Sequence, residues 1–146
     1  MRMKADLRTP SREEWLEWLT QFHGHLGPYA VIGFRMGEIA NERLTDHPFK
    51  KKALVKTGTK PSISCIIDGI QLSSCCTLGK GMIEVTDEKI PEATFTTGGK
   101  TLIIRLKDEI WGKIRSGIPD SENDEYSKQL FSANVEELFE ISTDTN

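Results

Sequence analysis

The sequence PYAVIGFRMG at residues 28–37 determines how the rest of the chain can pack. Its proline suits the first turn of a helix, and the residues that follow are apolar almost all round. This pattern predicts a central, buried helix from Pro28 to about Leu44. Gly33 and Gly37 lie one turn apart, and a glycine inside a helix costs about 0.5–1 kcal/mol relative to alanine. We therefore expect the two glycines to form a flat stripe that another element approaches closely.

A first helix is predicted immediately before the buried one. Ser11 is a suitable N-cap and Glu14 stands three residues later, which is the pattern of a capping box. Apolar side chains then recur at helical spacing from Trp15 to Phe22. The sequence HGHLGP at residues 23–28 ends this helix, because two glycines and a proline fall within a few residues.

The remainder of the chain predicts a cluster of strands between helices. Alternating residues indicate a strand over 52–59, and apolar spacing favours a helix from about Ser62 to Ser74, with Ser62 as its cap. Further elements are expected as a turn at 78–81, strands at 82–86, 93–97 and 101–106, a short helix at 107–116, an acidic loop at 120–124, a last short helix at 135–141 and a frayed end. The predicted fold class is α+β, with N-terminal helices packed on a mostly antiparallel sheet.

Composition excludes several classes of protein. The chain has 146 residues, 37% of them hydrophobic and 28% charged, with a net charge of −3, which suits one globular domain. The lack of a basic excess argues against a nucleic-acid partner, and we expect no membrane span because no apolar run reaches about 18 residues. Three cysteines are too few for a disulfide scaffold and favour a cytoplasmic location.

The pair His23 and His25 is the first feature that points to chemistry. With a glycine between them in a loop, both imidazoles can turn toward one point, and imidazole is a common ligand of zinc and other late transition metals. The alternative interpretation is a polar turn whose histidines cap helix ends.

Cys65 and Asp68 form the second feature. Cys65 is expected in the first turn of its helix, where the helix dipole favours a thiolate, and Asp68 lies on the same face three residues later. Together they could bind a cation or form a nucleophile with a polar partner. The alternative is a buried cysteine that packs as a small apolar side chain.

The third feature is the run Cys75-Cys76 followed by a Gly-Lys-Gly turn. Adjacent cysteines seldom bind one zinc together. A helix from Cys65 to Cys76 would rise about 16 Å, so these two thiols could share a metal only if the helix ends early or the site forms across a dimer. The chain contains no phosphate-binding loop, dinucleotide fingerprint, serine-hydrolase elbow or zincin motif.

In their order and spacing, these motifs resemble the FmdE family, which is named after a component of formylmethanofuran dehydrogenase. The resemblance rests on Phe22-His23-Gly24-His25 with Pro28, on Cys65-x-x-Asp68-x-x-Gln71, and on Cys76-Thr77-x-Gly79-Lys80-Gly81. It implies an α+β core, a homodimer, and a metal site with His23, His25, Cys65 and Cys76 as ligands beside Asp68. Members of the family tend to have glycine where this chain has Cys75, so Cys75 is expected to be dispensable.

The resemblance implies one domain over residues 1–146, without the cysteine-rich zinc module that some members carry at the C-terminus. The expected function is an accessory or metal-handling subunit related to formylmethanofuran dehydrogenase, with a divalent transition metal such as zinc, and with a larger enzyme complex as a possible partner. The alternative is a stand-alone metal-dependent enzyme acting on a small molecule, in which Cys65 and Asp68 are the catalytic residues. A plain dimeric interaction module is a further possibility.

Overall fold

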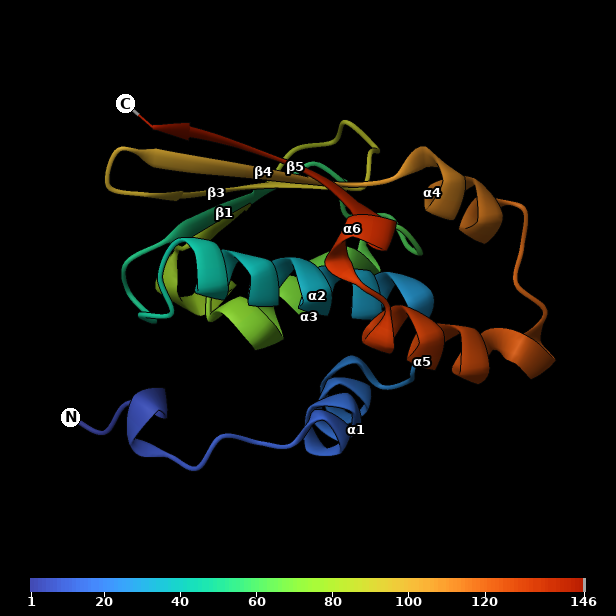
Figure 1. Cartoon of the computed structure of the whole chain (residues 1–146), viewed down its shortest axis with the longest axis horizontal. Helices are drawn as coiled ribbons and strands as arrows, with labels where there is room; N and C mark the ends of the chain where they lie inside the picture. The colour runs from blue at the N-terminus through green and yellow to red at the C-terminus, as the bar shows by residue number, and fades with distance from the viewer. Residues whose placement is uncertain (146) are drawn as a thin grey trace.

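The computed structural model describes residues 1–145, in which a five-stranded sheet packs on helices (Figure 1). The strands are β1 (Lys52–Val55), β2 (Ile83–Val85), β3 (Glu92–Thr97), β4 (Lys100–Leu106) and β5 (Phe139–Thr145), in the spatial order β2-β1-β3-β4-β5. Only the pairing of β1 with β2 is parallel. The predicted α+β class with a mostly antiparallel sheet is confirmed.

The helices form layers below the sheet, with α2 and α3 next to it and α1 beyond them (Figure 1). They are α1 (Arg12–His23), α2 (Pro28–Arg43), α3 (Cys65–Ser74), α4 (Asp108–Arg115), α5 (Asn123–Ser132) and α6 (Val135–Leu138), with 3-10 turns η1 (Lys4–Asp6), η2 (Leu78–Lys80) and η3 (Asp120–Glu122). Within residues 1–145, none of these helices combines the length and the apolar character that crossing a bilayer requires.

Helix α2 is the centre of the core, as its sequence predicts. The run from Tyr29 to Gly37 is buried without interruption, and α3 packs against it backbone to backbone. A Cβ atom added at Gly33 would stand 1.9 Å from the carbonyl oxygen of Ile66, and one added at Gly69 would stand 2.1 Å from that of Ala30. The predicted close approach is confirmed, and α3 is the element that makes it.

The capping box of α1 is also confirmed. The Glu14 backbone N–H donates to Oγ of Ser11 at 3.1 Å, and the Ser11 N–H donates to Oε1 of Glu14 at 3.0 Å. Glycine at residue 24 then ends the helix with a φ of 97°, a conformation that glycine adopts without steric cost. This sharp end sets the position of the His23 side chain in the last turn.

Two predicted boundaries in the middle of the chain are wrong. The first strand ends at Val55 rather than at residue 59, and α3 begins at Cys65 rather than at Ser62. Residues 61–64 form a turn, so Ser62 does not cap the helix, and the residue before Cys65 makes no side-chain capping bond either. Cys65 still lies in the first turn of α3, as predicted.

The C-terminal prediction is wrong in two places. The acidic loop at 120–124 is a 3-10 turn that leads into α5, a helix whose Tyr126, Leu130 and Phe131 are buried. The last helix stops at Leu138, and residues 139–145 form strand β5 instead of a frayed end. Strand β5 pairs with the whole of β4. The hydrogen bonds of β4 therefore outweigh the weak helical pattern of this segment.

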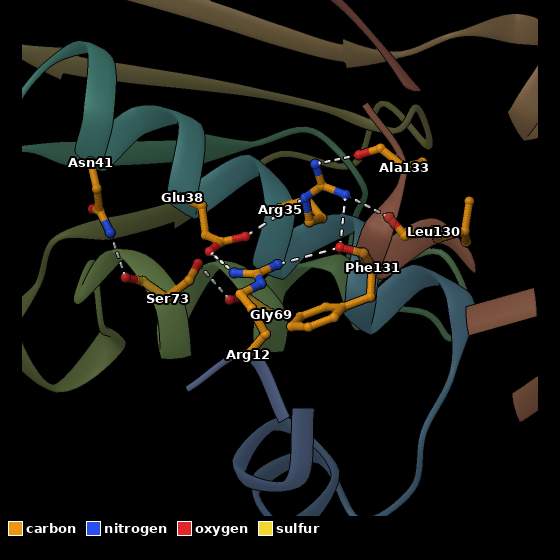
Figure 2. A network of polar contacts seen from close by, with 9 residues as sticks. All are labelled: Arg12, Arg35, Glu38, Asn41, Gly69, Ser73, Leu130, Phe131 and Ala133. Carbon is orange, nitrogen blue, oxygen red and sulfur yellow. Dashed lines mark hydrogen bonds and ion pairs between the residues drawn. The ribbon is translucent and has the colours of Figure 1, made fainter. Parts of the chain in front are cut away.

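Arg35 fixes α5 against the central helix, as Figure 2 shows. The Arg35 guanidinium is buried and donates to the carbonyl oxygens of Leu130 at 2.7 Å, Phe131 at 3.0 Å and Ala133 at 2.7 Å. Glu38 stands 3.6 Å away as its counter-charge. One side chain of α2 thus satisfies the last carbonyls of α5, which have no partner within their own helix.

Candidate metal centre

The structure pairs His23 with Asp68, two residues from different helices. Nδ1 of His23, at the end of α1, lies 2.6 Å from Oδ2 of Asp68 in α3. An ionised carboxylate only accepts hydrogen bonds, so Nδ1 carries the proton and donates. The imidazole side chain is 8% exposed and the carboxylate 40%. The contact therefore fixes the orientation of a nearly buried ring from its solvent side.

The other ring nitrogen of His23 is buried without a partner. Nε2 makes no hydrogen bond within the described residues. With Nδ1 protonated toward Asp68, Nε2 keeps its lone pair. A carboxylate on one nitrogen and a free lone pair on the other is the arrangement in which histidine binds a metal, because the carboxylate sets the tautomer and raises the basicity of the ligand.

His25 lies beside His23. The centroids of the two rings are 4.7 Å apart and the rings are tilted by 41°. His25 is exposed in the loop between α1 and α2, and a Cβ atom at Gly27 would stand 3.1 Å from its Cε1 atom. The prediction that the HGH loop brings its two imidazoles to one place is confirmed.

Cys65 begins α3, three residues before Asp68, and is partly buried. Burial is the larger cause that raises the pKa of its thiol, and the charge of Asp68 raises that pKa further, while its own backbone N–H lowers it. The expectation that the helix dipole lowers this pKa is therefore wrong for the metal-free chain. The thiol and the carboxylate do interact, as their spacing predicts.

Cys76 lies at the opposite end of α3 from Cys65, beyond a helix of about 15 Å. Its Sγ atom is buried and lies 3.5 Å from the carbonyl oxygen of Lys51. Burial raises the pKa of the Cys76 thiol, while the nearby ammonium of Lys51 lowers it. Cys75 occupies the end of the helix with a φ of 64°. The structure does not bring Cys76 to the cluster of His23, His25, Cys65 and Asp68.

Within residues 1–145 no group of three or more His, Cys, Asp or Glu side chains is close enough to hold a metal ion. The donor types of the cluster nevertheless fit a transition metal, because imidazole nitrogen and thiolate sulfur are the ligands that zinc prefers. The orphaned Nε2 atom of His23 is the structural observation in favour of that fit.

Sequence reasoning missed the His23–Asp68 pair, which is the best-formed contact of the cluster. It placed Asp68 with Cys65, its neighbour on the helix, because spacing within one helix can be read from the sequence. His23 and Asp68 are separated by 45 positions. Only the close packing of α3 in the helical layers brings them together, and no local pattern signals it.

A curated relative and a solved structure are similar to this chain. The relative, a probable S-adenosyl-L-methionine-binding protein of Archaeoglobus fulgidus, is 30% identical over 124 residues. The match takes in 82% of this chain but only 29% of the relative, so the chain spans less than a third of that protein's length. What that protein binds is thus the property of a much longer chain.

The solved structure is that of an FmdE-like protein of tungsten formylmethanofuran dehydrogenase from Syntrophus aciditrophicus. It has a TM-score of 0.72 and 26% identity to this chain, and the match covers 94% of this chain and 74% of the other. The profile described as "FmdE, Molybdenum formylmethanofuran dehydrogenase operon" matches residues 22–145, a span that contains every residue of the cluster. The chain is therefore a protein related to formylmethanofuran dehydrogenase and belongs to the FmdE family.

Proposed function

We propose that this chain is a metal-binding accessory protein that holds zinc or a similar divalent ion at Nε2 of His23. His25 and Cys65 are the further donors from the chain, and Asp68 is the positioning residue that keeps the His23 ring in place. The observation that carries the proposal is the pair of contacts at one imidazole: a carboxylate 2.6 Å from Nδ1, and no partner at the buried Nε2 within the described residues. Cys76 is outside this proposed site.

The accessory role includes assembly with a larger enzyme, because the family is described by a formylmethanofuran dehydrogenase operon. The alternative function is a stand-alone metal-dependent enzyme, for which a bound ion would supply a Lewis acid. Asp68 would then hold the ring, and Cys65 would serve as ligand or nucleophile. Transfer of bound zinc to a chelator within minutes favours the handling role, whereas retention of the ion favours the enzyme. The three free thiols suit a cytoplasmic location.

Loss of one imidazole should remove the metal. We expect purified chain to carry zinc after dialysis, and the His23→Gln variant to lose it, because glutamine cannot replace a nitrogen lone pair held by Asp68. Elemental analysis measures the zinc content. His47→Gln is the matched control, since His47 lies outside the cluster, where its Nδ1 accepts from the Phe49 N–H. Equal zinc in the two variants would contradict the proposed site.

The thiols provide a second comparison in the same assay. Cys65→Ser should lower the zinc content and Cys75→Ser should leave it unchanged, because only Cys65 lies next to Asp68. Zinc retained equally by both variants would remove Cys65 from the site and leave it as a core cysteine.

We also propose that the chain forms a homodimer, although not for the reason its sequence offers. The all-round apolar helix α2 is covered within one chain, so it needs no second copy. The support comes from α1, where Trp18 and Phe22 lie one turn apart and are 47% and 53% exposed. Sedimentation should give twice the chain mass of 16.4 kDa, and Phe22→Asp should return the monomer. A wild-type monomer at micromolar concentration would contradict the dimer.

A further inference from the structure

A cavity of about 510 Å³ lies on the side of the helical layers away from the sheet. Its walls come from α1, α2, α3 and the N-terminal segment of residues 4–10, which runs below α3 in Figure 1 before it reaches α1. The volume falls within the range of about 300–1,000 Å³ that is usual for small-molecule sites. None of the residues proposed to bind metal lines it.

Aromatic side chains form the apolar part of the wall. Trp15 and Trp18 line the cavity and meet edge to face, with centroids 5.3 Å apart. Phe34 lies 5.3 Å from the ring of Trp15 and is fully buried, so it backs the indole that the cavity exposes. Indole is the aromatic ring that attracts cations most strongly, because its face carries negative electrostatic potential.

The charged part of the wall leaves one carboxylate free. Lys4 and Asp46 neutralise each other at 2.7 Å, and Arg8 binds Glu14. Glu38 is held by arginines. Among the described residues, Glu42 has no ion-pair partner, so its charge is open to a ligand.

We propose that this cavity binds a small organic cation: an ammonium group carried on a flat, apolar body. The ammonium would lie between the indoles and the Glu42 carboxylate, and the apolar body would cover Trp15 and Leu72. The ion pair of Lys4 with Asp46 holds the N-terminal segment over the cavity, because it ties η1 to the loop after α2. The site is separate from the proposed metal centre, so either can fail without the other.

The test uses phenethylamine as the probe, with 3-phenylpropionate and 2-phenylethanol as partners of similar ring and chain but negative or no charge. The indole N–H signals of the three tryptophans report binding by NMR. Trp111 is an internal control, because it lies in α4 outside the cavity. Phenethylamine is expected to move the Trp15 and Trp18 signals with a Kd of about 1 mM, as suits a fragment of this size. The other two probes should bind at least several-fold more weakly.

Substitution at the free carboxylate makes the test specific. Glu42→Gln should weaken phenethylamine about fivefold, the value of one exposed ion pair, and leave 2-phenylethanol unaffected. Glu17→Gln is the matched control, an exposed carboxylate of α1 that does not line the cavity. The proposal is overturned if the three probes bind equally, if Trp111 moves with the others, if Trp15 and Trp18 do not respond, or if the two variants behave alike.

Discussion

Replacing Gly69 with alanine should destabilise the fold by about 3 kcal/mol or more, the upper range for overpacking a core. The added Cβ atom would stand 2.1 Å from the Ala30 carbonyl oxygen and 2.3 Å from the Phe34 nitrogen, and both atoms belong to the backbone of α2. Neither can rotate away, so the two helices must separate along their contact. Denaturant unfolding should show a lower midpoint with an unchanged slope.

Gly112→Ala is the matched control for this prediction. Gly112 also lies inside a helix, but a Cβ atom there meets nothing within 4 Å. The only effect of alanine is then its better helix propensity, and stability should rise by about 0.5–1 kcal/mol. The same substitution should therefore have opposite signs at the two positions. Equal effects would mean that α2 and α3 do not pack through their backbones.

Replacing Arg35 with methionine should cost about 3 kcal/mol, because hydrogen bonds from a charged donor contribute about 1.5–3 kcal/mol each and several are lost together. Methionine keeps most of the volume but leaves the carbonyl oxygens of Leu130, Phe131 and Ala133 without their donor. Burial lowers the pKa of Arg35, and Glu38 raises it. The guanidinium is therefore a buried charge that the carbonyls and Glu38 compensate.

The measurement is again denaturant unfolding, combined with hydrogen exchange in α5. The exchange protection of α5 should fall first, because its C-terminal end loses the bonds from Arg35. Arg43→Met is the control on the same helix, at an exposed position near its end, and should change stability by less than about 1 kcal/mol. An Arg35 variant as stable as the control would show that α5 is held by its apolar face alone.

The elements predicted well are those whose signals are local. The Ser11–Glu14 capping box starts α1 where its sequence indicates, and Gly33 marks the contact with α3. The elements predicted wrongly depend on distant partners. Strand β5 exists because β4 offers a complete row of hydrogen bonds. Helix α5 is fixed by Arg35, which lies 95–98 positions earlier.

The candidate site divides in the same way. The HGH loop and the Cys65–Asp68 spacing could be found in the sequence, because each is a short segment with defined geometry. The link between them could not, since His23 meets Asp68 only through the packing of two helices. This link also changes the chemistry. Asp68 acts on His23 as a positioning residue, and Nε2 becomes the atom available to a metal.

The most direct test of this account is the state of the two His23 nitrogens, measured by long-range ¹H–¹⁵N NMR before and after one equivalent of zinc. The account predicts that Nδ1 is protonated throughout because Asp68 accepts its proton, and that zinc moves the Nε2 resonance from the position of a free lone pair. His47 serves as the reference within the same spectrum. A response at Nδ1 instead of Nε2, or no response of His23 to one equivalent of zinc, would contradict it.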